Sequence, residues 1–304
     1  MTLSPPRPVT AARWLRPLAV ANLAANIAIV VTGGAVRVTG SGLGCPTWPR
    51  CTEESYVVHG ELGVHGAIEF GNRMLTFVLV AIAVACWVAA LRSRQGRPLA
   101  LATVVAFGIP AQALLGGLTV RTDLNPWVVA LHLLVSMAII GVCVVLLDSL
   151  RGPARAAAPT TVRRLTRLVL ASAWVVLYLG TVVTGSGPHS GDADSRRTGL
   201  DPQVMSHVHA VAVYVLVALT LGLLVLAHRA GQERVARAAG LLLTVELAQG
   251  AVGFTQYLLD LPEALVVLHL LGAALLSAAA TWVVVSAGQR SSGSSATETN
   301  SSAR

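Results

Sequence analysis

Eight apolar windows, each about 20 residues long and so able to cross a bilayer as a helix, dominate the sequence. They lie near residues 14–36, 67–91, 99–120, 127–148, 165–185, 204–227, 236–257 and 263–286. Apolar residues make up 54% of the 304-residue chain and charged residues 12%, which excludes a soluble enzyme. The same windows exclude a nucleic-acid-binding protein, although the net charge is +8. We therefore predict an all-α membrane protein with eight transmembrane helices.

The placement of arginine predicts the orientation of these helices. All 22 basic residues are arginine, because the chain contains no lysine. Sixteen of them lie before or at the start of the first window, in or beside the second, fourth and sixth connections, or in the tail. The other six are Arg37, Arg50, Arg73, Arg121, Arg196 and Arg197. By the positive-inside rule, we predict a plasma-membrane protein with both termini in the cytoplasm and the connection after the first window outside.

An internal repeat divides the chain into two halves. At an offset of 137 residues (132 to 269), residues 131–134 and 268–271 both read Leu-His-Leu-Leu, and Gln112 and Gly116 align with Gln249 and Gly253. We predict two homologous four-helix bundles in tandem, related by an axis along the membrane normal. The expected parts are a cytoplasmic segment (1–13), an N-terminal half (14–150), a C-terminal half (151–286) and a disordered tail (287–304).

The repeat selects the histidines that matter. His132 and His269 are partners, whereas His209 aligns with Asn72. The second half therefore presents His209 and His269 from two helices at equal depth, an arrangement that holds a haem iron on both axial sides. The alternative is that each histidine only bonds a neighbouring helix. His207 is a weaker candidate, because a helix turns it about 200° away from His209.

The first half carries a different set of polar residues from the second. His65, Glu69 and Asn72 fall at i, i+4 and i+7, on one face of a helix. Glu69 aligns with Ser206, so the second half lacks a carboxyl at this position. We expect the first half to combine His132 and Glu69 beside an incompletely ligated position where chemistry occurs. The alternative is that Glu69 only pairs with Arg73 at the membrane interface.

Cysteines and outer arginines add further candidates. Cys45 and Cys51 would close a short loop on the oxidising side, which favours a structural or redox-active disulfide. Cys86 and Cys143 are interpreted as plain core residues. Arg37 and Arg121 lie at outer helix ends, where they could pair with haem propionates. Snorkelling to the interface is the alternative explanation for both.

Three motifs together resemble haem A synthases of the actinobacterial type over roughly residues 14–286: Gly-Cys-Pro-Thr-Trp-Pro-Arg-Cys at 44–51, Glu-Phe-Gly-Asn-Arg at 69–73 and the paired Leu-His-Leu. The resemblance implies an oxidoreductase that converts the C8 methyl group of haem O to the formyl group of haem A, with water as the oxygen source. It implies haem b between His209 and His269, and haem O at His132. It also implies that Glu69 is the essential glutamate and that Cys45 and Cys51 are the outer cysteine pair.

One departure from the family pattern lies in the second window (67–91), where Asn72-Arg73 replaces the usual His-Arg. Either His65 supplies the second ligand to the substrate haem, or His132 binds alone and leaves a position open. The family implies partners in a haem O synthase and in terminal oxidase assembly, and an electron acceptor that the sequence does not name. Small-residue helix faces are compatible with a homo-oligomer. The alternatives are a b-type electron-transfer subunit and a haem transporter or chaperone, neither of which needs Glu69.

Overall fold

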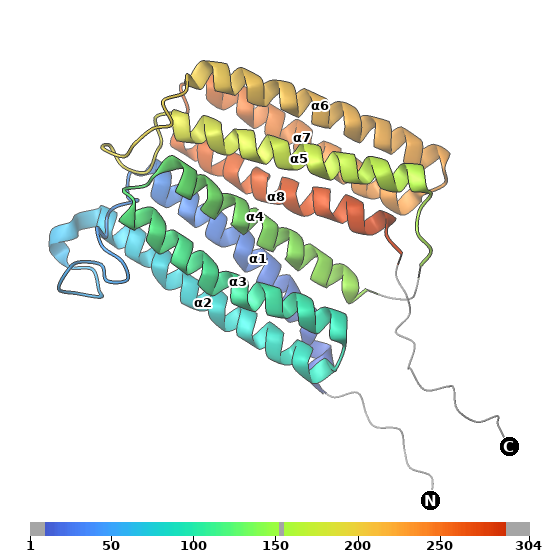
Figure 1. Ribbon diagram of the computed structural model, residues 1–304, viewed down its shortest axis with the longest axis horizontal. Coiled ribbons are helices and arrows are strands. Elements are labelled where there is room, and N and C mark those ends of the chain that lie inside the picture. Colours follow the sequence, from blue (N-terminus) through green and yellow to red (C-terminus); the bar gives the residue numbers. More distant parts are fainter. Residues whose placement is uncertain (1–9, 152–154, 290–304) are drawn as a thin grey trace, which may run out of the picture.

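The computed structural model describes residues 10–151 and 155–289, and over these ranges it contains helices and no strand. All eight apolar windows lie inside helices long enough to span a bilayer, so the prediction of eight spans is confirmed and the chain is a multi-pass membrane protein. The helices run side by side along the length of the molecule (Figure 1). They are α1 (Thr10–Val38), α2 (Gly63–Ser93), α3 (Gly96–Arg121), α4 (Pro126–Ser149), α5 (Thr160–Ser186), α6 (Pro202–Arg229), α7 (Glu233–Leu258) and α8 (Glu263–Ala287), with a short 3-10 helix, η1 (Gly60–Leu62), before α2.

Side-chain caps define where α4 and α6 begin. Asn125 accepts a hydrogen bond from the amide of Trp127 at the start of α4, and Asp201 accepts one from the amide of Val204 at the start of α6. In both helices a proline occupies the first helical position, where no amide hydrogen is needed. These caps satisfy backbone groups close to the membrane, where unpaired amides are costly.

The helices form two closed groups. In the first, α1 contacts α2, α2 contacts α3, α3 contacts α4 and α4 returns to α1; α5 to α8 contact one another in the same order. The groups meet along a seam where α8 lies against α1 and α4, and α4 lies beside α5 (Figure 1). The seam is tight, because a Cβ atom at Gly141 of α4 would lie 3.0 Å from the hydroxyl of Thr281 on α8. This arrangement is compatible with the predicted tandem bundles, whose symmetry stays a prediction.

Two matching turns support the repeat. The turns at residues 123–124 and 260–261 each place two consecutive non-glycine residues in the left-handed region, with φ between 49° and 60°. In each turn the amide of the second residue donates to a carbonyl five residues earlier, that of Thr119 or Gln256, over 2.8 Å. Left-handed conformations are uncommon for residues other than glycine. Their recurrence at the same 137-residue offset (123 to 260) is therefore specific evidence for duplicated α3–α4 and α7–α8 hairpins.

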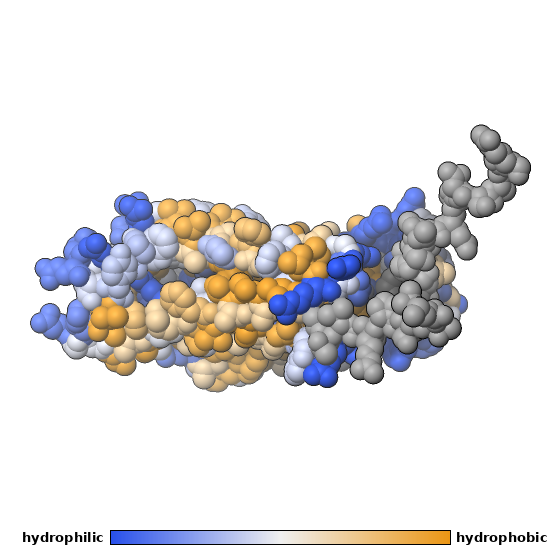
Figure 2. Space-filling view, turned by 90° about the horizontal axis from the view of Figure 1, so that it is seen from below, coloured by the Kyte–Doolittle hydropathy of each residue, from blue (hydrophilic) through white to orange (hydrophobic). Residues whose placement is uncertain are grey.

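The surface has the polarity of a membrane protein. Figure 2 shows apolar side chains over the middle of the molecule and hydrophilic ones toward its ends. Inside, Cys86 and Cys143 are fully buried free thiols, as expected for core residues. The predicted tail follows the end of α8, but residues 290–304 lie outside the described residues, as do residues 1–9 of the predicted N-terminal segment.

Candidate functional site

The connection between α1 and α2 packs onto the end of the first helix group (Figure 1). It contains the predicted disulfide between Cys45 and Cys51, and both cysteines are fully buried. Gly44 passes so close to α2 that a Cβ atom there would lie 2.3 Å from the carbonyl oxygen of His65. A Cβ atom at Gly117 of α3 would lie 2.3 Å from the ring of Trp48. Two glycines thus let this loop contact both α2 and α3.

Glu69 joins α2 to the same loop. Its side chain is buried, and Oε2 accepts a hydrogen bond of 2.6 Å from the amide of Cys45. Oε1 accepts from Arg73, at 3.1 Å from Nε and 2.5 Å from Nη2. The ion pair that the sequence left open as an alternative is therefore present. It accompanies a contact with the disulfide loop, which spacing along α2 does not predict.

Arg73 completes this connection between helix and loop. Besides the carboxylate of Glu69, its guanidinium donates to the backbone carbonyls of Cys45, Thr47 and Arg50 at 3.0 to 3.1 Å. One half-buried arginine therefore holds the disulfide loop at several points. Because the charge of Arg73 is balanced by Glu69, the cluster is electrically neutral at the outer end of α2.

His65 and Asn72 of α2 also contact α1 or the loop that follows it. Nδ1 of the exposed His65 lies 2.9 Å from the hydroxyl of Ser41. Asn72 is half-buried and accepts a hydrogen bond of 2.7 Å from Thr32 of α1 through its amide oxygen. Among the described residues, no hydrogen bond joins Glu69 to His65 or to the more distant His132. The structure thus places these groups on one side of α2 without linking them directly.

His132 is fixed by α3. Its ring lies against Gly116, where a Cβ atom would be 3.4 Å from Cε1. Gln112, one turn earlier on α3, donates through its amide nitrogen to the carbonyl of His132 at 2.9 Å and also to the hydroxyl of Ser136. Gln112 and Gly116 are the two α3 residues that the repeat aligns with α7. One therefore holds the backbone at His132 and the other leaves space for the imidazole.

The second half contains two histidines in similar surroundings. His209 lies in the second turn of α6 and His269 in the second turn of α8. A Cβ atom at Gly180 of α5 would lie 3.3 Å from Cε1 of His209, and one at Gly253 of α7 would lie 3.5 Å from Cε1 of His269. Each ring therefore packs against a glycine of a neighbouring helix, as His132 does. His207 is exposed, and the choice of His209 over His207 as a ligand stays a prediction.

The Nδ1 atoms of these imidazoles have few protein partners. Nδ1 of His132 and Nδ1 of His269 are buried and have no hydrogen-bond partner among the described residues. Nδ1 of His209 also lacks a hydrogen bond of ordinary geometry, although the carbonyl of Val176 lies near enough to interact with its ring. Buried polar atoms without partners are uncommon and call for an explanation. Paired imidazoles from facing helices, each beside a glycine, fit a haem in the second half.

The two outer arginines have different surroundings. Arg37 at the end of α1 donates from Nε to the carbonyl of His189 at 2.6 Å and from Nη2 to that of Thr184 at 3.1 Å. It therefore links the two helix groups at the end that carries the disulfide loop. Arg121 is exposed and borders a cavity of about 420 Å³ formed with residues 46–50 of the disulfide loop. Within the described residues, the guanidinium of Arg121 has no hydrogen bond, and Glu53 lines the same cavity.

A second buried carboxyl was missed by the sequence analysis. Glu246 of α7 is buried, and its Oε1 accepts a hydrogen bond of 2.8 Å from Thr220 of α6, whereas Oε2 has no partner among the described residues. It lies seven residues before Gly253, about 10 Å farther from the outer end of the helix. A single acidic residue inside an apolar window is the signal that identified Glu69, and it also applies to Glu246.

Comparison with known proteins connects this site to a family. The profile of the cytochrome oxidase assembly protein family matches residues 16–281. Haem A synthases of Listeria welshimeri and Bacillus pumilus are 35% and 33% identical over 115 and 129 residues, and that of Geobacillus kaustophilus is 28% identical over 140 residues. These alignments cover 36%, 40% and 42% of this chain, and the chain spans 37%, 40% and 42% of the relatives' lengths. Because the family profile covers most of the sequence, the chain belongs to the cytochrome oxidase assembly protein family.

Proposed function

We propose that this protein is a haem A synthase, an oxidoreductase that oxidises the C8 methyl group of haem O to a formyl group with water as the oxygen source. The observation that carries the proposal is the family match over residues 16–281, which includes all the histidines and the glutamate singled out above. The named relatives support the same activity over part of their length. Family membership also supports a role in terminal oxidase assembly, with a haem O synthase supplying the substrate.

The two halves have different tasks in this proposal. Residues 151–286 hold a resident haem b through His209 and His269. Bound there, haem b supplies one-electron redox chemistry. Residues 14–150 receive haem O at His132, and His65 is the candidate for a second ligand because Asn72 occupies the other family position. The support comes from the buried imidazoles beside Gly116, Gly180 and Gly253.

Glu69 is the candidate catalytic residue. Conversion of a methyl group to a formyl group with one water releases four protons and four electrons, so a proton acceptor near the substrate is needed. Oε1 of Glu69 accepts both hydrogen bonds from Arg73, whereas Oε2 accepts only the one from the Cys45 amide and keeps a further lone pair. Glu69 can therefore accept a proton while it stays bound to the loop. Arg73 is the positioning residue that sets its orientation.

Orientation follows from the arginine distribution. With both termini in the cytoplasm, the disulfide loop and the outer ends of α2, α4, α6 and α8 face the outside. The haem sites then lie in the outer half of the membrane, and Arg121 beside the disulfide loop is the candidate propionate contact. Arg37 has less capacity for this role, because two of its nitrogens already donate to backbone carbonyls.

The proposed activity is tested by identifying the haems that the protein produces. The full chain is expressed in a bacterial host that makes haem O and no haem A, and the extracted haems are identified by chromatography with mass detection. Appearance of haem A or of its hydroxymethyl intermediate is expected. Bound haem b with unchanged haem O, in the presence of a suitable electron acceptor, would contradict the proposal and favour a b-type electron-transfer subunit.

Single-residue variants distinguish the proposed roles of the two halves. His132→Ala is expected to abolish haem A formation while haem b stays bound. His269→Ala is expected to remove the haem b spectrum. His207→Ala is the matched control, since this exposed histidine lies on α6 two residues before His209, and it should change neither readout. Loss of haem b in His132→Ala instead of His269→Ala would reverse the assignment of the halves.

A further inference from the structure

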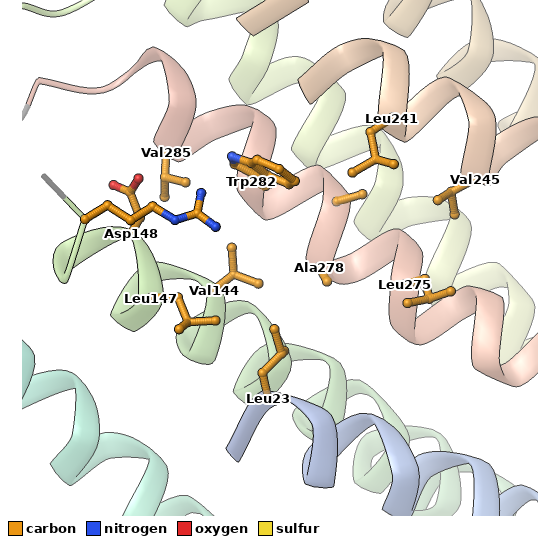
Figure 3. Close-up of a pocket in the computed structure, with 12 residues that line it drawn as sticks. Leu23, Val144, Leu147, Asp148, Leu241, Val245, Leu275, Ala278, Trp282 and Val285 are labelled. Carbon is orange, nitrogen blue, oxygen red and sulfur yellow. The ribbon is translucent and has the colours of Figure 1, made fainter. Parts of the chain in front are cut away.

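A groove of about 320 Å³ lies on the seam between the two helix groups, toward the end opposite the disulfide loop (Figure 3). Its walls come from α1 and α7, which do not contact each other within the described residues, and its floor comes from α4 and α8. The lining is mostly aliphatic and includes Leu23, Val144, Leu147, Leu241, Leu275 and Ala278. Leu241 and Leu275 are 43% and 40% exposed, so the groove opens to the surface of the protein.

The length of the groove matches one leaflet of a bilayer. Along α8 its lining runs from Leu275 to Val285, ten residues apart, which is about 15 Å at the rise of an α-helix. The hydrocarbon core of a bilayer is about 30 Å thick. A partner helix would need an apolar surface along the whole span, whereas an acyl chain from one leaflet needs half of it. The groove therefore has the length for a lipid tail.

The end of the groove near Val285 is polar and cationic. The exposed guanidinium of Arg151 stacks over the ring of Trp282 with 5.2 Å to the centroid, and has no hydrogen bond or ion pair among the described residues. Nε1 of Trp282 is buried and also has no partner there. Figure 3 shows Trp282 between Val285 and Ala278, beside the aliphatic lining. Within the described residues, neither of these two donors thus has an acceptor at this end of the groove.

The charge at this end is positive. Asp148 lies in the lining, but its carboxylate is bound by Arg155 at 3.1 Å and by Arg234 at 2.6 Å. Arg151 also lines the groove, so among the described lining residues and the partners printed for them, three guanidinium groups accompany one carboxylate, and this excess favours an anion. Tryptophan and arginine are the residues that contact headgroups at a membrane interface.

We propose that this groove is a binding site for one anionic phospholipid, with an acyl chain along α8 and the phosphate bound by Arg151 and the indole N–H of Trp282. Water is excluded as the occupant by the aliphatic lining. The site is separate from the histidines and from Glu69, so the proposal goes beyond the proposed haem chemistry and does not depend on it.

Native mass spectrometry of the full chain tests this proposal. The detergent-purified protein is exchanged into mixed micelles with equal amounts of phosphatidylglycerol and phosphatidylcholine, and the bound lipids are counted. We expect preferential retention of one phosphatidylglycerol, and about a fivefold weaker preference in Arg151→Gln, from roughly 1 kcal/mol per basic residue near the membrane surface. The matched control is Arg92→Gln, an exposed arginine in the last turn of α2 outside the groove, which should behave as the unmodified protein.

Two further variants test the contributions of the lipid acyl chain and of the indole N–H. Ala278→Phe fills the groove and should reduce retention of both lipids, while Trp282→Phe keeps a ring under Arg151 but removes the N–H donor and should lower only the preference for phosphatidylglycerol. The proposal is overturned if the two lipids are retained equally, or if Arg151→Gln matches Arg92→Gln. It is also overturned if a quinone or a second copy of the chain occupies the groove in place of the phospholipid.

Discussion

Replacement of Glu69 by glutamine separates the chemical role of this carboxylate from its role in holding the disulfide loop. The carboxylate accepts three charge-assisted hydrogen bonds, one from Cys45 and two from Arg73. Glutamine keeps one acceptor oxygen and presents an NH₂ group to partners that are themselves donors. Because breaking a buried ion pair costs about 3–5 kcal/mol, and Arg73 retains three carbonyl partners, we expect a loss of about 3 kcal/mol in stability.

Arg73→Gln supplies the comparison. It breaks the same ion pair from the other side and removes the contacts with the loop carbonyls, but it leaves the carboxyl group in place. If Glu69 accepts a proton from the substrate, Glu69→Gln should lower turnover by about 10²- to 10⁴-fold, the usual contribution of a positioned acid or base. Arg73→Gln should lower turnover much less, despite a similar loss of stability.

The assay is conversion of haem O by purified variants, together with thermal unfolding and the haem b spectrum of each. Glu61→Gln, an exposed glutamate in η1, is the control and should leave all three unchanged. Equal losses of turnover in Glu69→Gln and Arg73→Gln, at matched haem b content, would refute the reasoning. Glu69 would then serve only to hold the loop against α2.

Three further predictions concern the surroundings of the site. Gly180→Ala places a methyl group 3.3 Å from the ring of His209 and should lower the haem b content seen by absorbance, whereas Gly222→Ala on α6, with open space around it, should not. Asp148→Asn breaks the pairs with two arginines and should cost about 3–5 kcal/mol in thermal stability with haem content unchanged. Cys51→Ser opens the outer disulfide and should cost about 2 kcal/mol, measured by unfolding with and without reductant.

Local hydropathy was sufficient to predict the helices, because a membrane span must satisfy its own backbone and expose apolar side chains to lipid. The helix ends were less well predicted. The fifth window began at residue 165, whereas α5 begins at Thr160 and includes Arg163 and Arg164. These charged residues belong to the turn at the membrane surface, so hydropathy alone assigns them to the connection.

Besides the disulfide and the polar face of α2, the site was predictable where it depends on the repeat. Internal alignment identified His132 and His269, and the glycines beside them, because these residues recur at one offset. Two other contacts depend on how separate parts of the chain approach each other. They are the hydrogen bond from the Cys45 amide to Glu69 and the packing of Gly180 against the ring of His209. Such contacts leave no periodic pattern in the sequence. Glu246 was different, since a lone acidic residue in an apolar window was visible without a structure.

Arg37 and Asp148 determine how freely the two halves can move. Arg37 joins the groups at the outer end through two carbonyls, and Asp148 joins α4 to α7 at the other end through Arg234. At about 1.5–3 kcal/mol for each hydrogen bond to a charged group, separating both ends costs roughly 5–9 kcal/mol. Conformations that interconvert during a transport cycle differ by a few kcal/mol. Rocking of one helix group against the other, as alternating access requires, is therefore opposed from both ends of the seam, and the seam acts as a rigid joint between the groups.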